Sequence, residues 1–249
     1  MQWRLDKIDA RPQDLATALA LLTCLPINAR FERTAQAAWA YPVAGCVVAL
    51  LAGGCTWLAL LVGVPAQLAA FVWVGGCLLL TGGLHEDGLA DTADGLGGGK
   101  NAAHRLDIMR DSRVGSFGVM ALVLGLGARV VAVGMILQSP GWLAALLAVA
   151  MVSRATMPCL MAALPAARRD GLSYAQGRVP PGGATLAVAV AGLLALVLVG
   201  FIALALVLVA AGVTMVMGAI AQARVGGQSG DILGACQQCS EVALLMALL

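Results

Sequence analysis

The chain has 249 residues, of which 61% are hydrophobic and only 11% are charged, and its mean hydropathy is +0.92. This composition excludes an ordinary water-soluble enzyme and predicts a polytopic membrane protein. The net charge of +2 comes without any basic patch interleaved with aromatic residues, so we expect no nucleic-acid partner. No linker interrupts the chain, which predicts a single membrane-embedded domain, 1–249.

The first apolar run, 15–27, is too short to cross a hydrocarbon core of about 30 Å. It follows fourteen residues of mixed charge and has no small-residue cleavage pattern, so it is not a convincing signal peptide. We therefore expect a short interfacial or re-entrant helix that ends at Pro26.

Longer apolar stretches recur along the rest of the chain and predict an all-α bundle of about seven transmembrane helices. The block 184–222 contains no charged residue and is too long for one crossing, so we expect two helices that meet near Gly200. The predicted spans are 40–62, 66–84, 116–137, 141–164, 184–200, 202–222 and 231–249.

Lys and Arg residues lie on alternate connections between these spans. They occur before the first span, in 82–116, in 165–183 and at Arg224, and are absent near 63–65, 138–141 and 200–201. The positive-inside rule then places the N-terminus and the loop 82–116 in the cytoplasm. The sequence leaves the oligomeric state open, with a homo-oligomer among the options.

One polar segment, 81–118, holds six of the thirteen carboxylates of the chain. Asp87, Asp91 and Asp94 are spaced i, i+4 and i+7, so on a helix they share one face within about 60° of arc. Like charges this close repel unless a cation lies among them. We therefore expect these aspartates and Asp111 to bind Mg²⁺ together with a substrate phosphate. The alternative is a solvated loop whose charges only keep it in water.

The same segment supplies candidate phosphate ligands. Three arginines, Arg105, Arg110 and Arg113, flank acidic residues in RLDIMRDSR. A guanidinium group can donate two parallel hydrogen bonds to the oxygens of one phosphate. Their spacing is equally typical of an ordinary charged helix face. His85 is a further candidate for substrate binding, although a lone histidine near a membrane interface is more often structural.

Two arginines, Arg129 and Arg154, fall inside predicted spans. A charge in lipid is costly, so both should face the bundle interior or a wet cavity. We expect them to line a cavity that receives an anion, with pairing to helix-end carbonyls as the structural alternative.

A second polar cluster, RVGGQSGD at 224–231, contains Gly226, Gly227 and Asp231. This glycine-rich turn could cradle a phosphate at a helix start, or Asp231 could serve as a helix N-cap. A P-loop is excluded because GLGGGK at 95–100 lacks the required spacing.

Together these strings resemble the cobalamin synthase (adenosylcobinamide-GDP ribazoletransferase) family. The resemblance extends over nearly the whole chain and is carried by GGLHEDGLADTADGL, RLDIMRDSRVGSFGV and GGQSGDILGA, with LLTCLPI and WAYPVAG nearer the N-terminus. The chain departs from the family pattern at Cys24 and near Gln238. Glu86 stands where the family tolerates an apolar residue, which makes it a poor catalytic candidate.

The resemblance implies a Mg²⁺-dependent enzyme of the bacterial inner membrane. It would join adenosylcobinamide-GDP to α-ribazole or its 5′-phosphate, releasing GMP and forming adenosylcobalamin or its phosphate. The implied catalytic residues are Asp87, Asp91, Asp94, Asp111 and Arg113, of which the four aspartates are the metal ligands. The implied substrate-binding residues are His85, Arg105, Arg110, Arg129, Arg154, Gly226, Gly227 and Asp231.

Other classes of membrane protein fit less well. A CDP-alcohol phosphotransferase would have Ala-Arg after its first Asp-Gly, but Asp87-Gly88 is followed by Leu89-Ala90-Asp91. A prenyl-diphosphate enzyme would have DDxxD, which does not occur. A transporter could use Arg129 and Arg154 with acidic gates, but that leaves the glycine-rich acidic segment unexplained.

Overall fold

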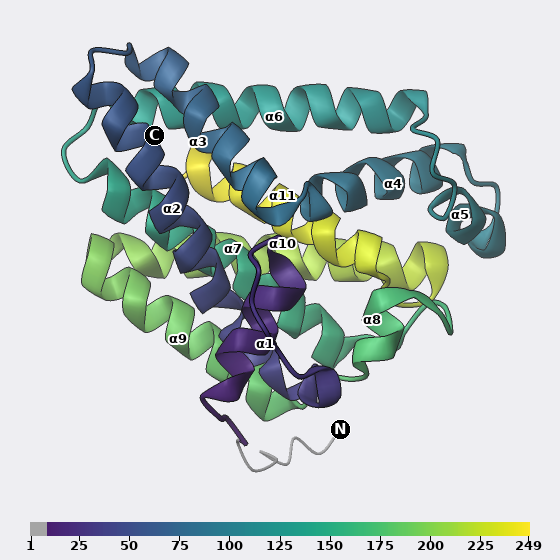
Figure 1. The fold of residues 1–249 in the computed structure, drawn as a ribbon. Coiled ribbons are helices and arrows are strands. Elements are labelled where there is room, and N and C mark those ends of the chain that lie inside the picture. Colours follow the sequence, from purple (N-terminus) through teal and green to yellow (C-terminus); the bar gives the residue numbers. More distant parts are fainter. Residues whose placement is uncertain (1–8) are drawn as a thin grey trace.

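A computed structural model describes residues 9–249, and in this range the fold is entirely helical (Figure 1). The helices are α1 (Gln13–Leu22), η1 (Phe31–Arg33), η2 (Gln36–Ala40), α2 (Tyr41–Leu61), α3 (Ala66–Thr81), α4 (Leu84–Gly98), α5 (Ala102–Ile108), α6 (Ser116–Ile136), α7 (Trp142–Ala163), α8 (Gly171–Gln176), α9 (Pro181–Val199), α10 (Ile202–Val225) and α11 (Gly230–Met246), where η denotes a 3₁₀-helix.

Five helical segments are long and apolar enough to cross a membrane, and the total is six if the bent pair α3 and α4 counts as one span. The predicted class of fold, a polytopic helical membrane protein, is therefore confirmed. The number of candidate spans among the described residues is lower than the seven predicted, for two reasons. α11 has 17 residues, carries Asp231 and Glu241, and is largely buried in the bundle. The predicted span 66–84 ends at Thr81, where the chain turns by 88° into α4.

The expected break in the long apolar block is confirmed. Gly200, with a positive φ of 62°, lies between α9 and α10, a backbone conformation that glycine adopts without steric cost. The N-terminal helix differs from expectation because α1 ends at Leu22 rather than at Pro26. Its last turn is closed at Thr23, whose N–H and hydroxyl both donate to the Leu19 carbonyl.

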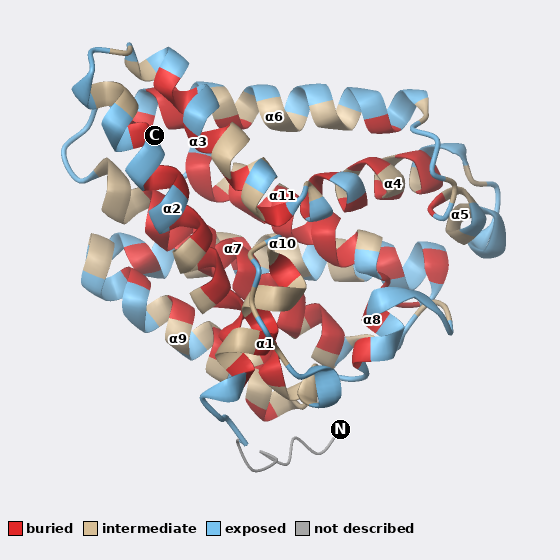
Figure 2. Cartoon of the chain, viewed as in Figure 1, coloured by how far each residue is buried: buried red, intermediate tan, exposed pale blue. Residues whose placement is uncertain are grey.

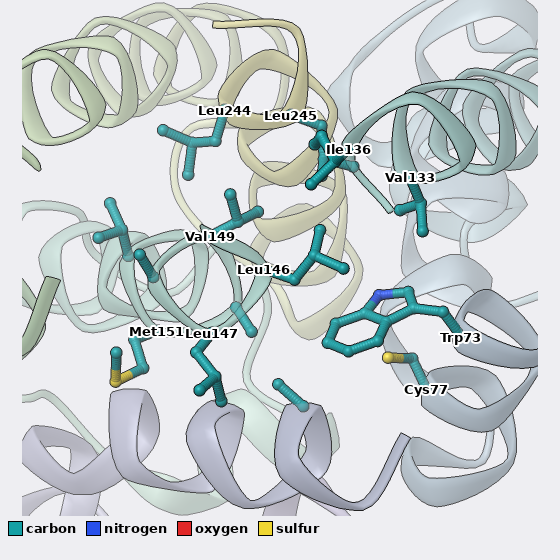
Figure 3. Close-up of a cluster of buried hydrophobic side chains, with 14 of the residues drawn as sticks. Trp73, Cys77, Val133, Ile136, Leu146, Leu147, Val149, Met151, Leu244 and Leu245 are labelled. Atoms are coloured by element: carbon teal, nitrogen blue, oxygen red, sulfur yellow. The ribbon is translucent and has the colours of Figure 1, made fainter. Parts of the chain in front are cut away.

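α7 is the centre of the bundle. It is the most buried of the five segments and packs against α2, α9, α10 and α11 (Figure 2). One apolar core joins α7 to α2, α3, α6 and α11. In it Leu146 of α7 lies between Trp73, Val133 and Leu244, whereas Leu147 points away from these three residues (Figure 3). Trp73 also meets Trp142 edge to face, with ring centroids 6.4 Å apart. This core packs α2, α3, α6 and α11 together with α7.

Candidate active site

The acidic helix α4 begins with a glycine-made corner. Gly82 and Gly83 both have left-handed backbone angles, with φ of 64° and 69°, which residues with a Cβ rarely adopt. The corner turns α4 away from α3 by 88°. It also brings the N-terminal turn of α4, with His85, Glu86 and Asp87, against the start of α11.

Close contact between α4 and α11 depends on two further glycines. A Cβ at Gly88 would lie 2.8 Å from the carbonyl oxygen of Asp231, and one at Gly234 would lie 3.1 Å from that of His85. The backbones therefore touch where Asp87 and Asp231 face a common cavity. Asp91, one turn further along α4, is repelled by both of these carboxylates.

The cavity between α4, α8 and α11 has a volume of about 140 Å³. Its polar lining includes His85, Asp87, Arg168, Ser173 and Asp231. His85 is only 2% exposed, and its Nε2 atom has no hydrogen-bond partner among residues 9–249. An unpaired polar atom at a cavity wall is typical of a ligand-binding position.

Arg168 is the cation of this cavity, and the sequence reasoning did not select it. Its Nη2 atom lies 3.3 Å from Asp231 and its Nε atom 3.3 Å from Asp170. Its Nη1 atom is buried and has no hydrogen-bond partner in the part of the chain that the structure describes. Arg110 reaches the other oxygen of Asp170 at 2.5 Å, so two arginines meet at one carboxylate beside the cavity. The sequence signal was present, since RRDG at 168–171 directly follows a span.

The glycines at 226 and 227 permit a positive backbone angle and a close contact between two backbone segments. Gly226 ends α10 with a φ of 81°, and a Cβ at Gly227 would overlap the carbonyl oxygen of Pro165. Ala167 N–H donates to Gln228 and Gln228 N–H donates to Pro165, each at 2.8 Å. These contacts, rather than a phosphate cradle, account for both glycines. Ser229 is the N-cap of α11, accepting from Ile232 N–H, and its hydroxyl also donates to Asp231.

Asp94 has a different environment from Asp87 and Asp91. It is buried, and its two carboxylate oxygens accept from Gly115 N–H at 2.7 Å and Gly118 N–H at 2.9 Å. These are the free amides at the start of α6, where a negative charge is also favoured by the helix dipole. Asp94 thus joins α4 to α6, and both of its carboxylate oxygens are already engaged by the protein, unlike those of Asp87 and Asp91 in the described part of the chain.

Asp111 and Arg113 lie outside the cavity. They form an exposed pair at 2.5 Å in a separate groove that also contains Asp94. Hydrogen bonds from Arg113 hold the pKa of the Asp111 carboxyl at about 2, so it is ionised at neutral pH. The predicted set of four carboxylate ligands is therefore divided between two places, and within 9–249 no three acidic, His or Cys side chains form a ready metal cluster.

The remaining predicted arginines have structural partners. Arg105 donates to the Arg224 carbonyl oxygen near the end of α10 at 3.2 Å. Arg154, 3% exposed, donates to Ala150 within its own helix at 3.1 Å. Neither lines the cavity that contains Asp87.

Arg129 is the centre of a buried ion network. It is 1% exposed and pairs with Glu86 at 2.5 Å and with Glu241 at 2.9 Å. Gln238 accepts from Arg129 and donates to Glu86, and Gln237 donates to Glu241 and to Ser153. Arg129 therefore binds protein carboxylates from α4 and α11 and not a ligand. The network joins four helices, α4, α6, α7 and α11.

We expect Gly88→Ala to reduce activity on the order of 100-fold, because the new methyl group would push α4 away from Asp231 and misplace the aspartates by about 1 Å. Steady-state kinetics of the purified protein measures this. Gly54→Ala on α2, where a Cβ meets open space, is the matched control and should retain full activity. Equal activity of the two variants would show that this helix contact does not position the site.

These features define a class: a polytopic helical membrane protein with an acidic helix, an arginine-lined cavity and no resemblance to a P-loop enzyme. The comparisons identify the family. The chain matches the cobalamin-5-phosphate synthase family over residues 14–249 and belongs to it. It is 43% identical over 246 residues to the adenosylcobinamide-GDP ribazoletransferase of Bradyrhizobium diazoefficiens, covering 94% of this chain and 92% of that protein.

Two further relatives carry the same name. Those of Azorhizobium caulinodans and Allorhizobium ampelinum are 41% and 40% identical, and each alignment covers at least 94% of both proteins. No solved structure matches the chain. The predicted family is confirmed.

Proposed function

We propose that the protein is a membrane-embedded adenosylcobinamide-GDP ribazoletransferase. It would join adenosylcobinamide-GDP to α-ribazole or its 5′-phosphate, giving adenosylcobalamin or its 5′-phosphate and GMP. The observation that carries the proposal is the meeting of His85, Asp87, Arg168 and Asp231 around one cavity. A volume of about 140 Å³ accommodates a diphosphate but not a corrinoid, so the macrocycle would lie outside the cavity.

Mg²⁺ is the proposed cofactor, held by Asp87 and Asp91. They lie one helical turn apart on α4, and no hydrogen bond or ion pair engages either carboxylate within 9–249. Magnesium commonly binds through one or two carboxylates and completes its shell with water and substrate phosphates, so the absence of a third ready ligand does not conflict with this assignment. When bound, the ion would offset negative charge on the diphosphate.

Arg168 and Arg110 would bind the phosphoryl oxygens, because guanidinium groups do so with two parallel hydrogen bonds. The ribazole hydroxyl oxygen would attack the phosphorus that bears the corrinoid. The bond from this phosphorus to the bridging oxygen would break, and GMP would leave with that oxygen. His85 lines the cavity and its Nε2 atom has no hydrogen-bond partner within 9–249, so we assign this atom as the acceptor of the hydroxyl proton.

Membrane location follows from the apolar helices. We propose that the membrane is the bacterial inner membrane and that the segment with α4, α5 and α8 faces the cytoplasm, because basic residues concentrate in 100–113 and 168–178.

The direct test uses the full chain in liposomes with adenosylcobinamide-GDP, α-ribazole and Mg²⁺. We expect GMP and a complete corrinoid in equal amounts, and loss of both products with EDTA. Folded protein that forms neither product at saturating Mg²⁺ would overturn the proposed activity. Product formation that is insensitive to EDTA would overturn the magnesium assignment alone.

We expect Arg168→Gln to raise the KM for adenosylcobinamide-GDP about tenfold or more, because one charge-assisted hydrogen bond to phosphate is lost. The KM for α-ribazole should change little. Arg169→Gln changes the neighbouring, exposed arginine and is the matched control. An unchanged KM for Arg168→Gln, or equal effects of both substitutions, would contradict the assignment.

A further inference from the structure

A long apolar groove lies apart from the cavity that contains Asp87 and shares no lining residue with it. It runs between α9 and α10 over α7, in two adjoining parts of about 220 Å³ and 670 Å³ that share Cys159, Val188, Thr214 and Met215. All three helices are among the segments able to cross a membrane, so the open side of the groove faces lipid. The mechanism proposed above makes no use of it.

The lining offers a ligand almost nothing except apolar contact. Three threonine hydroxyls line the groove, and each donates to a carbonyl oxygen within its own helix: Thr156 to Ser153, Thr185 to Pro181 and Thr214 to Ala210. The rest of the surface consists of Ala, Val, Leu, Met, Cys and Pro side chains, with Gly218. The groove therefore suits a hydrocarbon chain.

Its volume argues against a protein partner. A helix with side chains is about 10–12 Å across, and the part of about 220 Å³ is too small to hold one turn of such a helix between α9 and α10. A single acyl chain is thin and flexible enough to enter between the two helices. Exposed Val197, Leu204 and Leu208 on the outer faces of α9 and α10 continue the apolar surface toward the surrounding lipid.

A positive charge marks one end of the groove. Ala162 and Pro181 line that end, and exposed Arg178 donates through Nη2 to the Ala162 carbonyl oxygen at 3.2 Å. A guanidinium group has five N–H donors, so this bond leaves others for a phosphate. The start of α9 lies at the same end, and its dipole also favours a negative charge there.

We propose that this groove is a phospholipid-binding site, with one acyl chain between α9 and α10 and the lipid phosphate on Arg178. An apolar channel that ends at an exposed arginine beside the first turn of a membrane helix matches the two parts of such a molecule. The site is separate from the cavity that contains Asp87, so the inference does not depend on the proposed activity.

Native mass spectrometry of the full chain in detergent, titrated with phosphatidylglycerol, tests the site. Ala189→Phe places a ring in the groove and should abolish binding of the tightest lipid. Arg178→Gln should weaken that binding about fivefold, the effect of one basic residue near a membrane surface. Ala205→Phe, an exposed position on α10 outside the groove, and Arg169→Gln are matched controls that should bind as the wild type does.

Each other outcome counts against the proposal. Lipid binding by Ala189→Phe equal to that of the Ala205→Phe control would overturn it. Competition by inorganic phosphate without any effect of Ala189→Phe would indicate an anion site only. Conversion of a dimer to a monomer by Ala189→Phe, with lipid binding unchanged, would identify an interface between two copies. Unaltered thermal unfolding would show that the variants are folded.

Discussion

Asp87→Asn is expected to lower kcat on the order of 10³-fold while leaving the thermal unfolding temperature nearly unchanged. Asp87 is an exposed carboxylate at the mouth of the cavity, and its charge is repelled by its neighbours, so the folded protein gains little from it. The transition state for phosphoryl transfer depends strongly on this charge if it holds Mg²⁺ against the diphosphate. Single-turnover kinetics across a Mg²⁺ titration measures the effect.

Two other aspartates serve as controls because they share the segment but not the environment. Asp107→Asn changes an exposed residue on α5 and should retain activity. Asp94→Asn should show the opposite pattern from Asp87→Asn, because it removes the charge that pairs with the first amides of α6 and so lowers the unfolding temperature. If Asp87→Asn destabilised the protein as much as Asp94→Asn, Asp87 would be a structural residue.

Arg129→Met is expected to destabilise the protein by about 3–5 kcal/mol, because it leaves Glu86 and Glu241 buried without their cation. The measurement is the unfolding temperature, or the denaturant midpoint, in a mild detergent. The triple variant Arg129→Met, Glu86→Gln and Glu241→Gln removes all three charges and should recover most of the loss. Failure of the triple variant to exceed the single variant would show that packing around Arg129, not charge pairing, supports these helices.

The sequence predicted the apolar architecture well because membrane crossing depends on length and hydropathy, which are local properties. The division at Gly200 is an example, since a charge-free block too long for one span must turn somewhere near a glycine. The corner at Gly82 and Gly83 could not be recognised in this way. Hydropathy continues smoothly to residue 84, and whether two glycines form a bend depends on contacts with α11.

Individual roles within the acidic segment were the least predictable part of the site. Helical spacing places Asp87, Asp91 and Asp94 on one face, but only the fold brings Gly115 and Gly118 to Asp94. Glu86 is rotated by about 100° from Asp87, and this small difference directs it to Arg129 in the interior. Arg168 was overlooked because its contact with Asp231 forms only when residues 165–167 pair with Gln228.

The buried network around Arg129 has a consequence for biogenesis. Two of its carboxylate and amide partners, Glu241 and Gln238, belong to α11, which is synthesised after α4 and α6. Until α11 packs, Arg129 lies inside the membrane with Glu86 as its partner but without Glu241. Asp231 is also not yet beside α4. Packing of α11 therefore completes both the buried ion network and the proposed catalytic centre. We expect a chain stalled before α11 to be inactive and to be a target for membrane proteases.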